Sequence, residues 1–449
     1  MTTPLACVRQ LATRLVERPS DLDPLLDQVA DRPFVLLGEA SHGTAEFYRL
    51  RAEITRRLIE DKGFEAVLVE ADWPDMLRLN RFVTGDSQDT LLEAFDDFQR
   101  FPQWMWRNDE VRDFVLWLRD YNASLDDPQV GERQQDAASV GMYGMDIYSL
   151  HRSAEAVIAY LEGVDPEQAE RARRGYACLD HRGDPFHYGR NVAFGLSPSC
   201  EEASIELLTG LMNKASDYLD ADGRRAVAEQ FFAEQNARVV VNAEAYYRAM
   251  FTSRVDTWNL RDEHMTDTLK ELHYHLIHQG RKGKVVVWAH NSHLGDARGT
   301  EMGWGRQQHN VGQLARQRFG NRQVLLIGFT THTGHVSAAR DWDAPVQHRW
   351  VRPSLADSYE RLFHQSGLDR FYLPLESNRA DPLKARLLER AIGVIYRPET
   401  ERASHYFRAS LPAHFDGIFH LDETAAVSPF DRGDAWQKED IPDTYPFGV

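Results

Sequence analysis

The sequence contains few cysteines. Cys7, Cys178 and Cys200 are the only three among 449 residues, and they lie far apart in the chain. Their number is odd, and their spacing is not that of metal ligands. We therefore expect neither a disulfide framework nor a cysteine zinc site, and this cysteine usage favours a reducing, cytoplasmic environment.

Long apolar runs are also missing. The most apolar stretches, at residues 66–69, 284–289 and 324–329, are far shorter than the ~20 residues that a membrane-spanning helix requires. Residues 1–11 contain no continuous apolar segment of the kind that a secretory signal needs. We expect no membrane segment, and the short β-branched runs instead indicate buried strands of a mostly parallel sheet.

Positive charge is in deficit. There are 69 Asp and Glu residues against 52 Lys and Arg, which gives a formal net charge of −17. Because phosphate binding relies on clustered Lys and Arg, this balance argues against a nucleic-acid partner and against docking on anionic lipid. Hydrophobic residues make up 42% of the chain, which is enough to build a large core and excludes a disordered protein.

Several familiar catalytic signatures are absent from the sequence. There is no Gly-x-Ser-x-Gly nucleophile elbow, no Walker A motif, no Gly-x-Gly-x-x-Gly and no His-Glu-x-x-His. The cysteines stand in no basic or motif context typical of a nucleophile. Any hydrolysis is therefore expected to use direct attack of an activated water rather than an acyl-enzyme.

The chain begins its regular structure with a predicted βαβ unit. Residues 34–38 predict a strand, Thr44 can cap the following helix, and residues 66–69 predict the next strand. Further strands are predicted at 140–145, 284–289, 324–329, 393–396 and 417–421.

The composition of the sequence changes between residues 149 and 250, where strand-like apolar runs are absent and Ala, Glu and Arg dominate. We therefore predict an α/β fold, with a mostly parallel central sheet flanked by helices and a large all-helical insertion. The catalytic core would be discontinuous, at 1–148 and 251–449, and the insertion or lid would span 149–250.

Ionisable residues stand where the predicted strands end. The carboxyl ends of parallel strands meet at one edge of a sheet, and ligands bind there, so we expect these side chains to converge. They are Glu39, His42, Glu70, Asp146, His290, His293 and His332.

His42 is a candidate general base and Glu39 its partner, because a carboxylate orients a neutral histidine and stabilises its protonated form. A helix-capping loop with a hydrogen-bonded histidine explains the same tetrapeptide about as well. Glu70 ends an almost entirely apolar strand, so its carboxylate must be paired, solvated in a cleft or raised in pKa. A buried salt bridge to an arginine such as Arg51 is compatible with a functional role.

His290 and His293 form a second cluster. They could bind a metal together with the first cluster, or they could donate hydrogen bonds to a developing oxyanion. A polar loop that caps the next helix is the structural alternative. Arg261 could clamp an anion, although its spacing favours an ion pair within the fold.

The aromatic residues Trp73 and Tyr143 are candidates for lining a substrate pocket, although core packing is the commoner fate of such side chains. The residues that we predict to contact substrate are Trp73, Tyr143, Asp146, Arg261 and His332.

Five motifs, taken together, resemble the erythromycin esterase family. They are LGEASHG at 37–43, VEADWP at 69–74, WNLRD at 258–262, WAHNSH at 288–293 and GVIYRPE at 393–399. The ordered set covers residues 30 to about 425. The family is known for esterases that open macrolide lactones, an antibiotic-resistance activity, and it includes proteins described as succinoglycan biosynthesis proteins.

The resemblance also implies roles for individual residues. By position, the family's essential histidine base corresponds to His42, its acidic partner to Glu39, an active-site arginine to Arg51 and a second glutamate to Glu70. The histidine pair of the later loop corresponds to His290 and His293.

What the resemblance implies is a metal-independent ester or lactone hydrolase with no cofactor. His42 would take a proton from water, while Arg51 and the later histidines would stabilise the oxyanion and Glu70 would hold Arg51 or a water. Two alternatives remain. One is a metal-dependent hydrolase with a divalent ion at the same Glu and His cluster. The other is a non-catalytic ligand-binding or biosynthetic accessory protein. The expected partner is a small-molecule ester or lactone.

Overall fold

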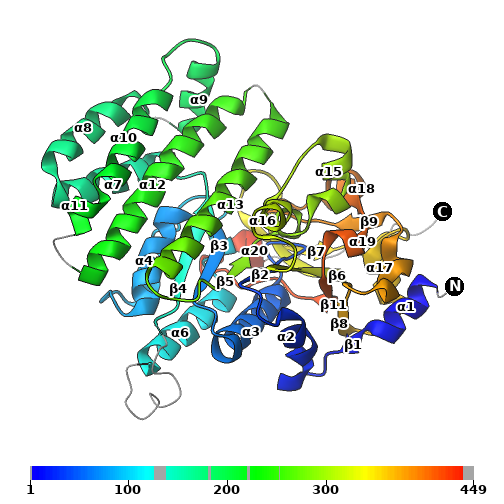
Figure 1. Ribbon diagram of the computed structural model, residues 1–449. Coiled ribbons are helices and arrows are strands. Elements are labelled where there is room, and N and C mark those ends of the chain that lie inside the picture. Colours follow the sequence, from blue (N-terminus) through cyan, green and yellow to red (C-terminus); the bar gives the residue numbers. More distant parts are fainter. Residues whose placement is uncertain (1–2, 126–137, 180–183, 220–222, 252, 438–449) are drawn as a thin grey trace. The chain divides into compact units, whose positions relative to one another are not determined.

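The computed structural model describes residues 3–125, 138–179, 184–219, 223–251 and 253–437 (Figure 1). The chain consists of two compact units. The core unit comprises Met1–Val67, Phe82–Gly141 and Lys282–Val449, and the helical unit comprises Leu68–Arg81 and Met142–Arg281.

The sheet of the core unit is parallel at its centre. Its strands follow the order β1-β8-β11-β6-β2-β5, and β7 pairs with β6. The four strands β5, β2, β6 and β11 run parallel, whereas β1, β7 and β8 pair antiparallel with their neighbours. Their bounds are β1 Thr13–Arg14, β2 Phe34–Leu37, β5 Val285–Trp288, β6 Val324–Ala339, β7 Val346–Val351, β8 Arg370–Pro374 and β11 Gly417–Thr424.

The helices of the core unit flank this sheet (Figure 1). They are α1 Pro4–Leu11, α2 Asp23–Val29, α3 Ala45–Lys62, α5 Leu91–Ala94, α6 Asp109–Ser124, α14 Asn291–Leu294, α15 Glu301–Arg306, α16 Val311–Phe319, α17 Tyr359–His364, α18 Glu401–Ser404, α19 Leu411–His414 and α20 Asp434–Gln437. The predicted α/β class with a mostly parallel sheet is confirmed.

One predicted strand is wrong. Residues 393–396 form no strand. Ile395 within this range and Ile392 just before it make only isolated bridges, to Ala339 and Ser41 respectively. The strand in this region comes earlier, as β9 (Leu387–Arg390), which pairs with β10 (Tyr406–Ala409) in a separate small sheet. A short β-branched run after a glycine therefore packs here as irregular backbone against the loop that follows β2.

Helix α3 begins and ends where its sequence indicates. Thr44 occupies the N-cap position, and Gly63 ends the helix with a left-handed φ of 66°, which glycine adopts without steric cost. Its buried residues recur at helical spacing: Phe47, Tyr48, Arg51, Ile54, Thr55 and Leu58. An arginine stands within this apolar stripe, so it must find a buried counter-charge.

The helical unit contains β3 from Leu68 onward and β4, together with a group of helices (Figure 1). The bounds are β3 Ala66–Asp72, α4 Trp73–Thr84, β4 Gly141–Asp146, α7 Leu150–Val164, α8 Pro166–Tyr176, α9 Pro185–Ala193, α10 Glu201–Asn213, α11 Ala215–Leu219, α12 Gly223–Ala249 and α13 Arg254–His278.

The insertion predicted at 149–250 corresponds to α7–α12, and the described residues in this range include no strand. The compact unit is larger than that prediction, because α13 packs against α12 and most of β3, α4 and β4 belongs with these helices.

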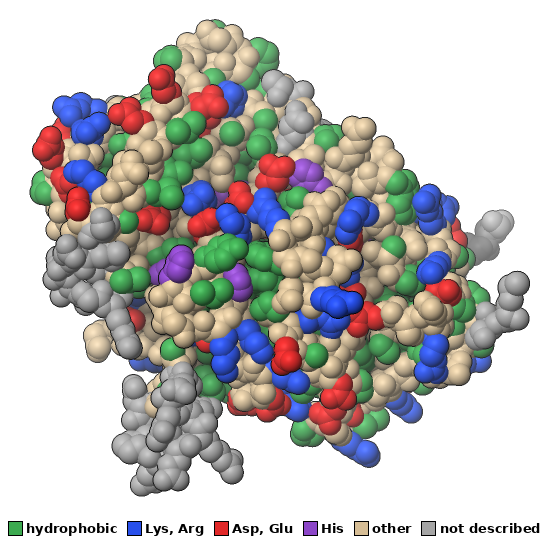
Figure 2. Space-filling model, in the orientation of Figure 1, with side chains coloured by type: hydrophobic (Ala, Val, Ile, Leu, Met, Phe, Trp, Pro, Cys, Tyr) green, Lys and Arg blue, Asp and Glu red, His purple; other side chains and the backbone are tan. Residues whose placement is uncertain are grey.

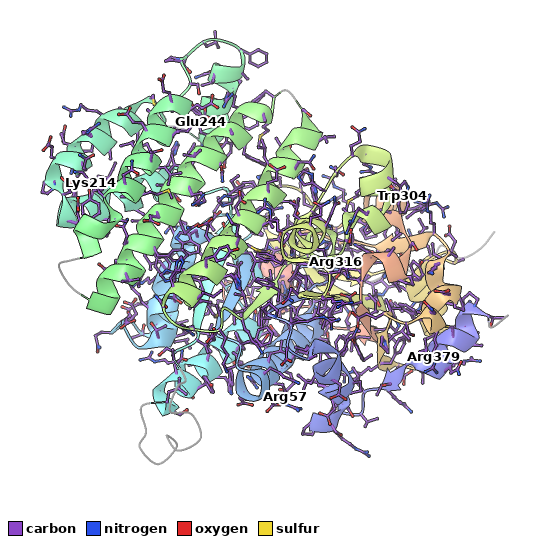
Figure 3. The ribbon with its side chains drawn as sticks, in the orientation of Figure 1. Arg57, Lys214, Glu244, Trp304, Arg316 and Arg379 are labelled. Carbon is purple, nitrogen blue, oxygen red and sulfur yellow. A yellow bond between two sulfur atoms is a disulfide. The ribbon has the colours of Figure 1, made fainter. Side chains whose placement is uncertain are left out.

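A buried carboxylate organises part of the helical unit. Glu244, labelled on α12 in Figure 3, accepts hydrogen bonds from Tyr188 Oη at 2.8 Å and Ser199 Oγ at 2.7 Å.

The cysteines correct one expectation. Cys178 and Cys200 form a disulfide, which joins the end of the α8 region to the start of α10. Spacing along the sequence did not indicate this, because it carries no information about how helices return the chain to the same place. Cys7 is a buried free thiol, and burial raises its pKa. The cysteine argument for a reducing environment therefore does not hold.

Two further expectations concern the surface. Across the ranges that the structure describes, no helix has both the length and the apolar character needed to cross a membrane. Figure 2 shows Lys and Arg interspersed with Asp and Glu on the helical unit, without a continuous basic patch on that face. A basic patch is the usual footprint of a nucleic-acid site.

Candidate active site

The loop after β2 is packed against its surroundings at two glycines. A Cβ added at Gly38 would lie 2.1 Å from Asn291 Oδ1, and one at Gly43 would lie 1.8 Å from the Ser337 carbonyl oxygen. Both positions therefore require glycine because of close approach. Residues 39–44, which we call the base loop, connect β2 to α3 and pack against β6 at Gly43.

Glu39 lies at the centre of a three-residue charge arrangement. Its Oε1 is 2.8 Å from His42 Nδ1, and its Oε2 is 2.6 Å from Arg51 Nη2. All three residues are buried, with His42 the most exposed at 6%. Because an ionised carboxylate only accepts, Nδ1 of His42 carries the proton that is donated to Glu39, and Nε2 is left as the acceptor.

Arg51 is buried next to Glu39. Its side chain is fully buried, and its guanidinium carbon is 4.4 Å from the ring centre of Tyr48 and 5.1 Å from that of Trp288. A group in this position balances the charge of Glu39. The oxyanion role of Arg51 stays a prediction.

The second histidine cluster follows β5. Nδ1 of His290 lies 2.8 Å from Ser292 Oγ and 3.2 Å from the Ser292 backbone nitrogen, so it acts as an acceptor. The ring proton of His290 is then on Nε2, which makes that nitrogen a donor. The rings of His42 and His290 are 5.0 Å apart. His293 is buried on α14.

Asn291 connects the two loops. Its backbone N–H donates to the Glu39 carbonyl at 2.8 Å, and its Nδ2 donates to the Phe329 carbonyl at 2.8 Å. Its Oδ1 accepts the Phe329 N–H at 3.2 Å. One buried amide thus fixes the base loop, the start of α14 and β6 in register.

Glu70 has a different partner from the one expected. In the helical unit it accepts from Arg261 Nη2 at 2.7 Å, and Asp146 accepts from the same guanidinium at 2.8 and 2.7 Å. Burial alone would lower the pKa of Arg261, but Asp146, Tyr148 and Glu70 together raise it well above its ordinary value. The suggested pairing of Glu70 with Arg51 is therefore wrong, whereas Arg261 forms the ion pair that its spacing favoured.

The predicted substrate contacts lie in several environments. Trp73 is fully buried, stacks 5.9 Å from Tyr143, and donates from Nε1 to the Phe232 carbonyl at 3.2 Å. This is core packing within the helical unit. Tyr143 is half-buried, and burial raises the pKa of its hydroxyl.

His332 belongs to another cluster of the core unit. Its Nδ1 lies 2.6 Å from Ser354 Oγ, and its ring stacks 3.8 Å from that of His364, which pairs with Asp422. Burial lowers the pKa of His332 to about 4. The contacts of its side chain are with these residues and not with the base loop.

Glu39 is a poor metal ligand in this arrangement. Its Oε1 is hydrogen-bonded to His42 Nδ1, and its Oε2 lies in an ion pair with Arg51. The cation Arg51 stands 2.6 Å from the carboxylate that would have to bind a second cation. Within the described ranges, no group of three or more His, Cys, Asp or Glu has the arrangement of a metal site. We therefore derive no step through a metal.

Two residues were not singled out from the sequence, Tyr48 and Trp288, and Asn291 was noted only as part of the second histidine cluster. Tyr48 stands three positions before Arg51 on α3, the spacing at which helical side chains meet. Asn291 and Trp288 flank His290 in one of the motifs. These positions in the sequence were the available signals, but contact with Glu39 or Arg51 is visible only in three dimensions.

Comparison with known proteins gives one family. A sequence model described as erythromycin esterase matches residues 59–424. The Escherichia coli protein "Erythromycin esterase type II" is 21% identical over 430 residues, covering 90% of this chain and 93% of that protein. The matched segment begins after Glu39, His42 and Arg51, so the roles of these three residues depend on their geometry.

Solved structures share the fold. A Bacillus cereus protein has a TM-score of 0.73 at 20% identity, covering 95% of this chain and 98% of its own. A succinoglycan biosynthesis protein has a TM-score of 0.72 at 19% identity, with coverages of 95% and 97%. A mutant of the erythromycin esterase EreC in its open conformation has a TM-score of 0.64 at 15% identity, with coverages of 92% and 98%.

Proposed function

Since the chain belongs to the erythromycin esterase family and is therefore an ester hydrolase, we propose that it hydrolyses a carboxylic ester or macrolide lactone through a water molecule activated by His42. The observation that carries this proposal is the shared carboxylate of Glu39, which holds His42 at 2.8 Å and Arg51 at 2.6 Å. This arrangement leaves Nε2 of His42 as a base of fixed orientation.

The chemical step needs no covalent enzyme intermediate. Nε2 of His42 removes a proton from water, and the water oxygen forms a bond to the carbonyl carbon of the ester. As the tetrahedral intermediate collapses, the bond to the alkoxy group breaks, and His42 returns the proton to the departing alkoxide. A positioned base of this kind typically contributes ~10²–10⁴-fold in rate.

The later histidines supply the oxyanion contacts in this proposal. Nε2 of His290 is the protonated nitrogen, and the ring of His290 lies 5.0 Å from that of His42. A donor at this distance from the base can face the carbonyl oxygen while the base faces the attacking water. One such donor typically contributes roughly 10²–10³-fold. His293 and Glu70 remain predicted catalytic residues.

The substrate class is tested by a hydrolysis screen. Purified protein is incubated with erythromycin, simple lactones and 4-nitrophenyl acetate, and products are detected by the mass gain of one water. We expect hydrolysis of at least one ester class, and a His42→Ala variant that folds but loses roughly 10²–10⁴-fold in rate. Near-normal hydrolysis by that variant would show that another residue is the base.

The absence of a covalent intermediate has its own test. The enzyme is quenched in acid during steady-state turnover, and its intact mass is measured. We expect the unmodified mass. An adduct with the mass of the substrate's acyl group would contradict direct attack by water.

The net charge of −17 supports including a cationic, amino-sugar macrolide in the hydrolysis screen, because the protein attracts such a substrate.

A further inference from the structure

We infer that Tyr48 is a positioning residue for the proposed reaction, acting on both halves of the Glu39–His42 pair. Its hydroxyl fixes the backbone of His42, and its ring supports Arg51, the counter-ion of Glu39. The inference rests on the proposed function, because a positioning residue has an effect only if His42 is the base.

The hydroxyl of Tyr48 connects two segments of the core unit. It lies 2.8 Å from the carbonyl oxygen of His42 and 3.0 Å from that of Met105, so it donates to both in a shared hydrogen bond. Tyr48 is 1% exposed, so little water can replace either interaction. Loss of this hydroxyl would remove the hydrogen bond from Tyr48 to the His42 carbonyl, which holds the base loop at this point.

The backbone around Met105 is also held by hydrogen bonds, from Asn108. Asn108 Nδ2 donates to the carbonyls of Met105 and Trp104 at 3.0 and 3.1 Å. Its Oδ1 accepts the Val111 N–H at 2.8 Å and so caps α6. The hydroxyl of Tyr48 therefore holds the base loop against a turn that is fixed to a four-turn helix.

The ring of Tyr48 acts on the other half of the pair. The guanidinium carbon of Arg51 lies 4.4 Å above it, with Trp288 on another side at 5.1 Å. Trp288 is oriented by a hydrogen bond from its Nε1 to Thr55 Oγ1 at 3.0 Å. Tyr48, Arg51 and Thr55 follow the i, i+3, i+7 spacing of one helical face, so α3 presents them together.

The expected consequence is kinetic. A base must stay within hydrogen-bond reach of its proton, and a displacement of about 1 Å can cost on the order of 10²-fold in rate. Tyr48 is behind the base and does not form the substrate surface. Its removal should therefore lower kcat and leave KM nearly unchanged.

The test compares two tyrosines with the same change. Tyr48→Phe removes only the hydroxyl and keeps the ring beside Arg51. The matched control is Tyr359→Phe, because Tyr359 is fully buried and its hydroxyl also lies against backbone carbonyls, those of Ala385, of Leu383 at 2.9 Å and of Ala409 at 3.2 Å. Rates are measured with the best ester from the screen, and stability is measured as Tm.

We expect Tyr48→Phe to lower kcat about 10–100-fold with KM within about twofold. We expect Tyr359→Phe to lower Tm at least as much while kcat stays within about twofold. Tyr48→Leu, which also removes the ring from Arg51, should lose more kcat than Tyr48→Phe.

Two results would overturn the inference: kcat of Tyr48→Phe within about twofold of the parent, or equal losses of kcat in the Tyr48 and Tyr359 variants. The proposed function fails separately, if His42→Ala retains activity. A dead His42→Ala together with a fully active Tyr48→Phe would reject only the role of Tyr48.

Discussion

Each of the two units pairs an arginine with buried carboxylates, one in the core unit and two in the helical unit, and the two arrangements differ in their third member. In the core unit, Arg51 takes one oxygen of Glu39 and His42 takes the other. In the helical unit, Arg261 is held by two carboxylates, Glu70 and Asp146. Both arginines also lie over tyrosine rings, at 4.4 Å for Arg51 and 5.0 Å for Arg261.

The difference lies in the third partner. A carboxylate shared between an arginine and a histidine stays charged and still directs an imidazole, so the core cluster retains a group that can move a proton. An arginine shared between two carboxylates forms ion pairs with both, and this set of three contains no imidazole. In the proposed function, similar residues therefore supply a base in one unit and an ion-pair anchor in the other.

Glu39→Gln should break the core cluster with the largest effect. The amide would donate to Nδ1 of His42, which moves the ring proton to Nε2, the nitrogen that must accept from water. We expect kcat to fall by roughly 10²–10⁴-fold. The measurement is steady-state hydrolysis of the best ester at matched folded concentrations.

Asp146→Asn is the matched change in the helical unit. It also converts a carboxylate beside an arginine into an amide, but it leaves the partner of the proposed base unchanged. Glu70 still neutralises Arg261, so we expect kcat to fall less than about 10-fold. Equal losses of kcat in the two variants would remove the distinction between base and anchor.

The arginines themselves should differ in stability. Arg261→Met leaves two carboxylates buried without their cation, and removing one partner of a buried pair typically costs about 3–5 kcal/mol. Arg51→Met leaves only Glu39, which still accepts from His42, so the loss in unfolding free energy should be smaller. Urea unfolding measures both, and a greater loss for Arg51→Met would contradict the comparison.

The disulfide is a feature of the helical unit alone. Cys178 and Cys200 are 22 positions apart, and a loop of this length predicts a contribution of about 3 kcal/mol by chain entropy. Replacing both with serine should lower the Tm of the protein and leave kcat unchanged. In the parent, alkylation after denaturation should modify one thiol, that of Cys7. Three modified thiols would show that the bond does not form.

The parts that the sequence predicted correctly are those that local pattern controls. Apolar runs predicted β2, β5, β6 and β11, and the rule for parallel sheets placed Glu39, His42 and His290 after strand ends. Partner identity was not predictable in this way. Glu70 was suggested as the partner of Arg51, yet it pairs with Arg261, because the docking of α13 decides the pairing. The expectation of no disulfide and the strand expected at 393–396 were wrong for the same reason.

Glu360 offers the smallest and most specific test, because it is a buried carboxylate without the arrangement of either cluster. One of its oxygens accepts the Arg390 backbone N–H at 2.8 Å, while the Arg390 guanidinium donates mainly to carbonyls. Burial raises the pKa of Glu360 to about 7. The folded protein then holds a proton that the unfolded chain has released, so stability falls as pH rises from about 4.5 to about 7.

Glu360→Gln cannot ionise and should escape this fall, which is on the order of 1–3 kcal/mol. The Tm of the variant relative to the parent should therefore increase between pH 5 and pH 8. Buried histidines such as His332 and His405, whose pKa values burial lowers to about 4, weaken both proteins below pH 6.5 and cancel in the difference. A difference in Tm that stays constant with pH would contradict a raised pKa for Glu360. Its carboxylate would then be stabilised in the charged form, as in a paired cluster, and the contrast between paired and unpaired buried carboxylates would fail.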